Sequence, residues 1–164
     1  AATAAPLPPE EPPAVRVRSH GLRAVPWTPS VVPKTHSSGT FVSLSKFRGK
    51  VVLLHSWAKD CSVCETEIPW FMEFQQKFRT RGLVVLGIAR DAEAWKQVPD
   101  SDRNPINYRK LIGGDEIFGG YGAINVTTPV TLIIDKTGRI AGTHTGLCSK
   151  SEYESAITDL LNED

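Results

Sequence analysis

Two apolar runs along the chain have the length and composition of buried strands. VVLLHSW, residues 51–57, has few polar interruptions, and LVVLGIA, residues 83–89, has no polar side chain. A run that is apolar on both faces is typical of a central strand covered on each side by helices. Neither run approaches the ~18 residues needed to span a bilayer, so both indicate strands of a globular core.

A helix is predicted between these two strands, over residues 62–80. Apolar side chains recur there at helical spacing, at Val63, Ile68, Phe71, Phe74 and Phe78. Pro69 falls inside the helix and should kink it, because proline removes one backbone hydrogen bond. Gly82 then ends the helix just before the second strand.

The C-terminal third of the sequence predicts a β-hairpin and then a helix. VTLIID, residues 130–135, and GRIAGT, residues 138–143, flank a turn that runs from Asp135 to Gly138. The sequence S-x-x-E at residues 149–152 is a capping box, and it opens a last helix that continues through Leu161.

Shorter elements complete the order β-α-β-α-β-β-α. Helical turns are predicted over residues 91–97 and 115–121, with a polar, proline-bearing loop between them, and a β-hairpin is predicted near Val31 and residues 40–43. This order describes an α/β fold in which a mixed sheet carries helices on both faces.

The first 14 residues differ in composition from the rest of the chain. They are almost wholly Ala, Pro and Glu, which cannot bury enough apolar surface to become ordered. We therefore predict a disordered stem over residues 1–14 and a single domain over residues 15–164. The stem is either a frayed tail or the remnant of a removed signal peptide or membrane anchor, and the second interpretation predicts a periplasmic or secreted protein, with a membrane tether upstream as one form.

Composition and charge narrow the classes of function. Hydrophobic residues make up 40% and charged residues 23%, a normal globular mix, and the net charge is +1. This balance gives no indication of nucleic acid or an anionic membrane as a partner. Three cysteines are far too few for a disulfide scaffold, so their contribution to function depends on the chemistry of the individual thiols.

Two of the three cysteines lie in WAKDCSVCETEIP, residues 57–69, at the predicted start of the helix. Residues i and i+3 share a helix face, so Cys61 and Cys64 are within reach of a disulfide bond. Unpaired backbone N–H groups at a helix start stabilise negative charge and favour a thiolate at Cys61. Because only the thiolate attacks a disulfide, a C-x-x-C after a buried strand predicts a redox dithiol.

These motifs resemble the thioredoxin superfamily, and most of all the extracytoplasmic thiol-disulfide oxidoreductases related to TlpA, ResA and CcmG. The matching pieces are GKVVLL, SWA-x-x-C-x-x-C, E-x-P at Glu67 to Pro69, Thr128-Pro129 with the following LIID, and DKTGRI. The resemblance covers the chain from Pro26 to Leu161. It implies a thioredoxin-like three-layer sandwich with an N-terminal β-hairpin extension, no cofactor beyond the redox-active disulfide, and partners that carry protein thiols or disulfides, including an electron-donor thiol protein.

The same resemblance implies roles for single residues. Cys61 is implied as the nucleophile and Cys64 as the resolving thiol. Thr128 and Pro129, the latter in the cis form, would line the groove that holds the backbone of the partner. Trp57 is assigned either to this substrate site or to packing beneath the motif.

Glu67 occupies the position of an acid that tunes the dithiol in the ResA and CcmG branch. It follows Cys64 by three residues and faces the same way, so a partly buried carboxylate there would accept the proton of the resolving thiol. The alternative is a solvated glutamate in the first turn that complements the helix dipole.

Asp60 and His55 depart from the family pattern. Asp60 stands where the family usually has Trp; its charge should raise the pKa of Cys61, with Lys59 partly opposing, and this predicts a reductant. Equally, Asp60 is expected as the N-cap of the helix. His55 is either a proton shuttle near neutral pH or, more often for such a histidine, a hydrogen-bonded packing residue.

The third departure is Cys148. Hairpin pairing should place residues near Thr145 opposite Pro129, so the segment HTGLC returns towards the dithiol. Cys148 is then an auxiliary thiol or a small buried residue ahead of the last helix.

Two rival functions use the same residues. Cys61, Cys64, His144 and Cys148 form a plausible Cys₃His zinc site, or a copper site. A thiol peroxidase of the same fold is the other rival, although the signature P-x-x-x-[ST]-x-x-C is absent because Trp57 and Ala58 stand where it would begin.

Overall fold

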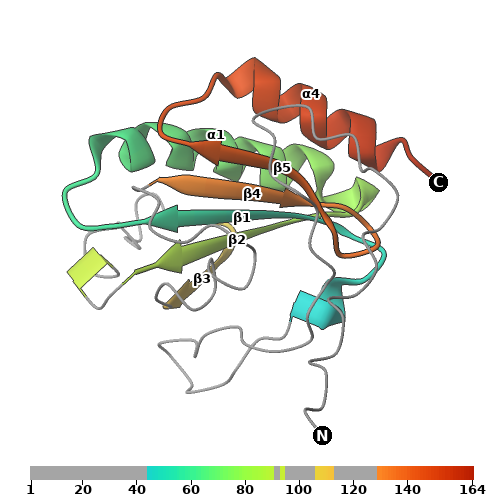
Figure 1. Ribbon diagram of the computed structural model, residues 1–164, viewed down its shortest axis with the longest axis horizontal. Helices are drawn as coiled ribbons and strands as arrows, with labels where there is room; N and C mark the ends of the chain where they lie inside the picture. Colours follow the sequence, from blue (N-terminus) through green and yellow to red (C-terminus); the bar gives the residue numbers. More distant parts are fainter. Residues whose placement is uncertain (1–43, 91–92, 95–105, 113–128) are drawn as a thin grey trace, which may run out of the picture.

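The computed structural model describes residues 44–90, 93–94, 106–112 and 129–164, and its centre is a five-stranded mixed sheet (Figure 1). The strand order is β3-β2-β1-β4-β5. The strands are β1 (Val51–Trp57), β2 (Leu83–Ala89), β3 (Arg109–Ile112), β4 (Val130–Ile134) and β5 (Ile140–Thr145). β1, β2 and β3 run parallel, whereas β4 is antiparallel to both β1 and β5. The two strands predicted from the apolar runs are therefore confirmed as neighbours at the centre of the sheet.

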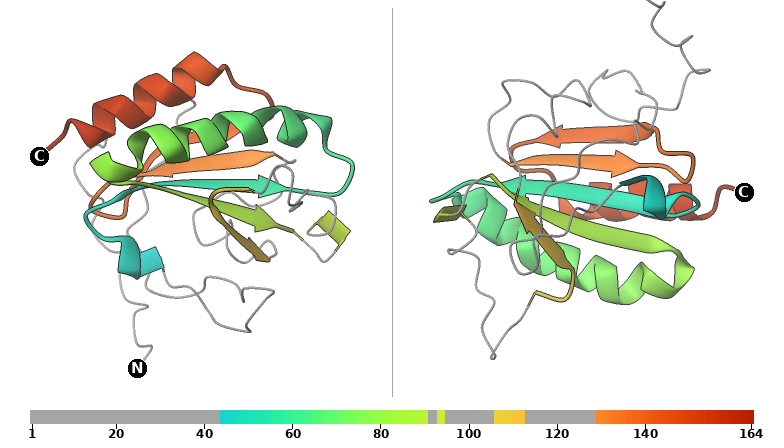
Figure 2. Two further views of the ribbon diagram at one scale, coloured as in Figure 1. Left: turned by 180° about the vertical axis from the view of Figure 1, so that it is seen from behind. Right: turned by 90° about the horizontal axis from the view of Figure 1, so that it is seen from below.

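Two α-helices, α1 (Ser62–Phe78) and α4 (Lys150–Leu161), lie against the same face of the sheet, as the views in Figures 1 and 2 agree. α1 is followed directly by a 3₁₀ turn, η2 (Arg79–Arg81). The C-cap of this turn is Gly82, where φ is 105°. Helices on both faces were expected. Of the helix predicted over residues 91–97 only residues 93–94 are described, and they are helical; the helix predicted over residues 115–121 lies outside the described residues.

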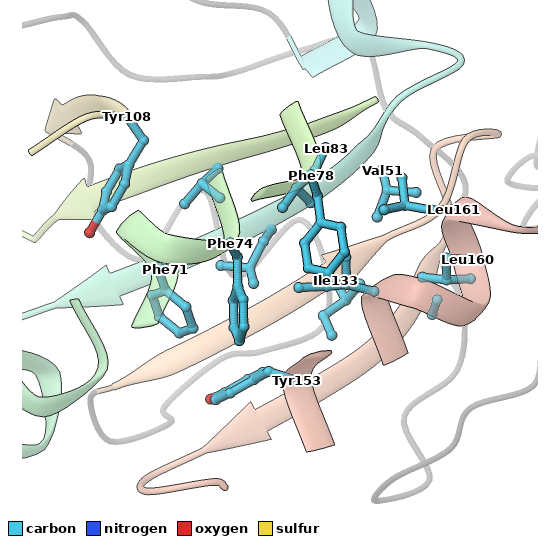
Figure 3. Close-up of a cluster of buried hydrophobic side chains, with 14 residues drawn as sticks. Val51, Phe71, Phe74, Phe78, Leu83, Tyr108, Ile133, Tyr153, Leu160 and Leu161 are labelled. Carbon is cyan, nitrogen blue, oxygen red and sulfur yellow. The ribbon is translucent and has the colours of Figure 1, made fainter. Parts of the chain in front are cut away.

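The core between the helices and the sheet explains why these segments fold as they do. Successive side chains of a strand point to opposite faces, so Val51 and Leu53 of β1 face the helices while Val52 and Leu54 face the other side. The helix-facing cluster collects large apolar side chains from both helices and three strands (Figure 3). Its aromatic members Phe71 and Tyr153 meet edge to face, with ring centroids 5.2 Å apart. This contact ties α1 to α4 directly over the centre of the sheet.

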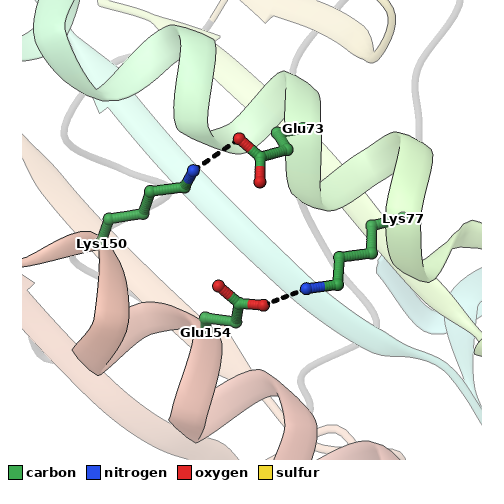
Figure 4. Close-up of polar contacts among 4 residues, drawn as sticks. All are labelled: Glu73, Lys77, Lys150 and Glu154. Atoms are coloured by element: carbon green, nitrogen blue, oxygen red, sulfur yellow. Dashed lines mark hydrogen bonds and ion pairs between the residues drawn. The ribbon is translucent and has the colours of Figure 1, made fainter.

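Two ion pairs add to the contact between the helices (Figure 4). Lys150 of α4 lies 2.5 Å from the Glu73 carboxylate of α1, and Lys77 of α1 pairs with Glu154 of α4. Exposed pairs of this kind each contribute at most about 1 kcal/mol. Both partners advance by four residues from one pair to the next, so the two helices run side by side in the same direction.

The C-terminal hairpin and helix agree with their sequence signals. The turn from Asp135 to Gly138 closes with a hydrogen bond from Gly138 N to Asp135 O of 3.0 Å, and the Asp135 carboxylate accepts from the backbone of Thr137 at 2.9 Å. The predicted capping box is present, because Ser149 and Glu152 each accept a hydrogen bond from the other's backbone.

Two short elements were not predicted. β3 has the sequence RKLI, in which two basic residues precede two apolar ones, so it lacks the alternation that would predict a strand. A 3₁₀ turn, η1 (Leu44–Phe47), precedes β1 and buries Leu44 against the sheet face opposite the helices. The predicted N-terminal hairpin and the stem over residues 1–14 lie outside the described residues.

Among the helices of the described residues, none is both long and apolar enough to cross a membrane.

Gly87 of β2 provides a test of the packing beneath the helices. A Cβ atom at this position would lie 2.5 Å from the Trp57 ring and 2.9 Å from the Tyr108 ring, and both rings are held in the core. We expect Gly87→Ala to lower the free energy of unfolding by about 1–3 kcal/mol, because overpacking forces the rings to move. Urea denaturation of the two proteins measures the difference.

Gly142→Ala is the matched control, because it places the same methyl group in a strand where the nearest atom lies 3.6 Å away. It should change the stability by less than about 1 kcal/mol. Equal effects of the two substitutions would contradict the assignment of Gly87 to a close aromatic contact.

Candidate active site

The cysteine pair lies at the junction between β1 and α1. β1 ends at Trp57, a short turn follows, and α1 begins at Ser62, so Cys61 is the N-cap residue of the helix. Cys61 and Cys64 form a disulfide bond, with Cα atoms 5.2 Å apart. Cys61 is half-buried, whereas Cys64 is only 2% exposed. A partner molecule can therefore reach the first sulfur and not the second.

The helix start is capped by sulfur. The backbone N–H of Cys64 donates to Cys61 Sγ at 3.2 Å, which satisfies one of the N–H groups left unpaired at a helix start. The expectation that Asp60 is the N-cap is therefore wrong. Asp60 instead adopts a left-handed backbone, with φ of 58°, on an exposed turn beside Lys59. Aspartate is among the residues that tolerate this conformation, and it lets the chain turn sharply before the nucleophilic position.

Trp57 lies beneath the cysteine pair. Its side chain is 1% exposed and packs in one cluster with Cys64, Ile68 and Ala94. The indole N–H donates to the backbone oxygen of Ala94 at 2.9 Å. This burial agrees with packing beneath the motif and leaves no surface of Trp57 to line a substrate groove.

Ser56, which the sequence did not single out, connects the cysteine pair to the segment at Pro129. The ladder between β1 and β4 stops at His55, and the Ser56 hydroxyl continues it by accepting from Val130 N at 3.0 Å and donating to Val130 O at 3.2 Å. The backbone oxygen of Ser56 lies 4.0 Å from Cys64 Sγ. One residue therefore contacts both the buried sulfur and the chain next to Pro129.

The return of β5 towards this end of the sheet is confirmed, with a one-residue difference. Thr145 pairs with Val130, and Gly146 N donates to the oxygen of the buried Pro129 at 3.0 Å. An irregularity in the ladder between Ile133 and Ile134 shifts the register from the predicted one. Thr128 lies outside the described residues.

Glu67 is completely buried, so the alternative of a solvated first-turn glutamate is wrong. Its Oε2 atom accepts a hydrogen bond of 2.6 Å from the hydroxyl of Tyr153 on α4. Its Oε1 atom has no hydrogen-bond partner among the described residues. Burial raises the pKa of Glu67 to about 7, although the bond from Tyr153 lowers it in part. The carboxyl group is thus poised to gain or lose a proton near neutral pH.

A row of polar side chains crosses the strands below Glu67 and Tyr153. His55, Thr131 and His144 are paired across β1, β4 and β5. His55 Nδ1 lies 3.2 Å from Thr131 Oγ1, and the His144 ring meets the Tyr153 ring edge to face at 4.7 Å. The neighbouring Thr131 side chain lowers the pKa of Tyr153 in part, against the larger effect of burial.

His55 has the surroundings of a packing residue. It is fully buried, and its ring meets Phe71 edge to face at 4.6 Å. Burial lowers its pKa to about 3, so the imidazole is neutral at physiological pH. A shuttle near neutrality requires a ring that titrates there, so these contacts favour the packing interpretation.

Cys148 is a half-buried free thiol in the segment before α4. Its Sγ donates to the Glu152 carboxylate at 3.1 Å. Burial and the neighbouring carboxylate raise its pKa to about 12, so it remains a protonated thiol at neutral pH. It is therefore a poor auxiliary nucleophile in this state.

The zinc or copper alternative is not supported by the arrangement. Cys61, Cys64, His144 and Cys148 all belong to the described residues, among which no group of three or more His, Cys, Asp or Glu side chains is placed to hold a metal ion. The first two sulfurs are bonded to each other, and Cys148 faces Glu152.

Comparisons with known proteins agree with this geometry. Residues 28–143 match the protein family described as the AhpC/TSA family. The chain is 31% identical over 124 residues to the thiol-disulfide oxidoreductase ResA of Bacillus thuringiensis subsp. konkukian, and the match covers 75% of this chain and 70% of ResA.

Two solved structures share the fold at lower identity. A putative thiol:disulfide interchange protein DsbE from Chlorobium tepidum superposes with a TM-score of 0.70 at 23% identity, covering 87% of this chain and 100% of that one. A secreted thiol-disulfide isomerase from Corynebacterium glutamicum gives 0.68 at 21% identity, covering 80% of this chain and 82% of that one. At these identities the likeness concerns the fold.

The burial of Glu67 predicts a pH-dependent stability. Its pKa is raised from 4.5 to about 7 in the folded protein, so the folded state holds this proton more tightly than the unfolded state. The resulting stability is present below pH 4.5 and is lost as the pH rises through 7. Glu67→Gln, which mimics the protonated acid, should therefore gain stability relative to the wild type, by on the order of 2 kcal/mol between pH 4 and pH 8.

Urea denaturation of the oxidised proteins across this pH range measures the gain. Titration of His55 is common to both proteins and cancels in the difference. Glu65→Gln, at an exposed position on the same helix, is the control for the loss of one negative charge from α1. A constant difference between Glu67→Gln and the wild type would contradict the raised pKa.

Proposed function

The chain belongs to the AhpC/TSA family and is a thiol-disulfide oxidoreductase, and on this premise we propose that it reduces disulfides of partner proteins outside the cytoplasm. The observation that carries the proposal is the asymmetry of the Cys61–Cys64 pair. The first sulfur caps a helix on an accessible turn, whereas the second is buried one turn later. Exchange needs one sulfur that meets the partner and a second that meets only the first.

The reaction begins with the reduced dithiol. The Cys61 thiolate attacks one sulfur of the partner's disulfide, a bond forms between Cys61 and that sulfur, and the partner's other sulfur leaves as a thiolate and takes up a proton. The Cys64 thiolate then attacks Cys61 Sγ, which forms the Cys61–Cys64 disulfide and releases the partner's second thiol. Two electrons pass from the dithiol to the partner, and a separate thiol protein restores them.

Glu67 is the base for the second step. It lies three residues after Cys64 on the same helix, and its carboxyl group is enclosed with a pKa of about 7. A carboxylate with this pKa takes the proton of the Cys64 thiol near neutral pH and returns it when the pair is reduced again.

The partner's backbone lies along Thr128 and Pro129, the latter in the cis form. The contacts of Ser56 with Val130 and with the Cys64 region support this placement, because they hold the chain after Pro129 beside the disulfide. Trp57 supports the site from below, by packing, and does not contact the partner.

The direction of transfer is set by the turn before the nucleophile. Asp60 adds a negative charge next to Cys61, which disfavours the thiolate and makes the pair more reducing. An extracytoplasmic location is supported by the composition of residues 1–14, an Ala- and Pro-rich spacer of the kind that joins a domain to a membrane anchor.

Single cysteine substitutions test the proposed roles. Cys61→Ser should lose at least about 10³-fold in the rate of disulfide reduction, because the attacking thiolate is gone. Cys64→Ser should complete the first step and stop, leaving a mixed disulfide that mass spectrometry identifies after expression in cells. Cys148→Ser is the control and should keep the wild-type rate.

The same proteins separate exchange from a thiol peroxidase. The rates with a protein disulfide and with hydrogen peroxide are measured in parallel. Rapid turnover of peroxide by the wild type, with no partner trapped by Cys64→Ser, would overturn the proposal.

Asp60→Asn tests the origin of the reducing character. Asparagine tolerates the same left-handed backbone, so the substitution removes the charge and keeps the turn. Because the position is exposed, we expect a small fall in the pKa of Cys61 and a rise of roughly 10–20 mV in the reduction potential. Thiolate absorbance and equilibration with glutathione measure the two quantities; an unchanged potential would remove Asp60 as its cause.

A further inference from the structure

We propose that Tyr153 is a positioning residue that orients the carboxyl group of Glu67, so that Oε1 exchanges the proton with Cys64 and Oε2 does not. The inference rests on the proposed role of Glu67 in disulfide exchange. Tyr153 comes from α4, 86 residues away in sequence, and its hydroxyl reaches the carboxyl group inside the core. It does not contact the sulfur atoms in any described hydrogen bond, so its effect passes through Glu67.

The hydrogen bonds around Tyr153 form a chain with one direction. The Tyr153 hydroxyl has a single hydrogen, which it donates to Glu67 Oε2, so towards the neighbouring Thr131 side chain its oxygen can act only as an acceptor. With the single hydroxyl hydrogen of Thr131 directed towards Tyr153, Thr131 Oγ1 accepts a hydrogen bond from His55 Nδ1. The chain therefore runs from His55 through Thr131 and Tyr153 to Glu67, with every donor pointing towards the carboxyl group.

The tautomer of His55 follows from this chain. Nδ1 carries the hydrogen, and Nε2 is the bare nitrogen, which has no hydrogen-bond partner among the described residues. A neutral ring in this tautomer agrees with its complete burial. The hydrogen on His55 Nδ1 thus fixes the direction of this series of hydrogen bonds, and the ring stays neutral.

The direction of the chain decides which oxygen of Glu67 is protonated. A proton on Oε2 would oppose the Tyr153 hydroxyl, which already donates to that oxygen. A proton on Oε1 leaves every bond of the chain in place. Oε1 is also the oxygen with no partner among the described residues. The proton therefore resides on Oε1 when Glu67 is neutral, and it leaves from there.

The other titratable groups around this site come from β1, β5, α1 and the segment before α4, and His55 of β1 begins the hydrogen-bond chain described above. His144 of β5 packs on the Tyr153 ring, Cys148 lies before α4, and the Cys61–Cys64 pair starts α1. The Cys148 thiol donates to Glu152, away from Glu67. Tyr153 is thus the residue whose hydroxyl supplies a donor to Glu67 in the described part of the chain.

Tyr153→Phe tests the proposal, because it keeps the ring contacts with Phe71 and His144 and removes only the donor. The readout is the pKa of the Glu67 side chain, followed by carbon NMR of the carboxyl group in the oxidised protein, where no thiol chemistry contributes. We expect the pKa of Glu67 to rise by about one to two units, since a donor to the charged form is lost. Thr131→Val, which removes the next hydroxyl, should raise it by a smaller amount.

Tyr108→Phe is the matched control. It removes another buried hydroxyl from the same core cluster, one that has no partner among the described residues. It should leave the pKa of Glu67 within about 0.3 units of the wild-type value, below the effect of one lost hydrogen bond. A Glu67 pKa in folded Tyr153→Phe that is equally unchanged would overturn the proposal. If Tyr153→Phe does not fold, an unchanged pKa in Thr131→Val overturns it.

A second arm separates this inference from the function on which it rests. In the reduced proteins, Tyr153→Phe should move the pH midpoint for oxidation of the dithiol by glutathione disulfide upward with the pKa of Glu67, while Glu67→Gln should abolish this midpoint. If Glu67→Gln leaves the pH profile unchanged, the role of Glu67 in exchange fails, even where Tyr153→Phe shifts the carboxyl pKa as expected.

Discussion

The chemistry of this protein depends on a cysteine sulfur that serves as the N-cap of a helix. Because β1 is buried along its whole length and α1 begins within five residues of its end, the turn between them must be tight, and the left-handed Asp60 makes it so. The cap hydrogen bond from Cys64 N then holds Cys61 Sγ against the N–H groups of the first turn. In the reduced state the same N–H groups favour the thiolate, so the local fold and the reactivity have one cause.

The disulfide divides the site into an accessible side and an enclosed side. Cys61 faces the turn, while Cys64 and Glu67 lie in the core with Trp57 and Tyr153 around them. A carboxylate in such surroundings is unfavourable unless it receives hydrogen bonds, and it receives one from Tyr153 of the neighbouring helix α4. The cost of enclosing it raises its pKa to about 7, close to neutral pH, which is what a proton acceptor for a thiol requires.

Local signals in the sequence predicted most of the elements and the residues of the motif. The apolar runs, the S-x-x-E capping box and the turn at Asp135 each depend on neighbouring residues, and each is present in the structure. The residues that complete the site depend on contacts between distant segments. Thr131 reads as an ordinary strand residue and Tyr153 as a helix packing residue, and only the docking of α4 on β4 and α1 joins them to Glu67. The cap was misassigned for a related reason, since Asp60 has the better capping side chain but the turn places Cys61 at that position.

The shared direction of α1 and α4 has a consequence for the behaviour of the site in solution. Parallel helices place like poles of their backbone dipoles side by side, which is unfavourable, and the pairs Glu73–Lys150 and Lys77–Glu154 between the same two helices oppose this repulsion. Dissolved ions screen the repulsion and the attraction together. The position of α4 beside α1, and with it the hydrogen bond from Tyr153 to Glu67, is therefore expected to stay nearly constant from dilute buffer to high ionic strength.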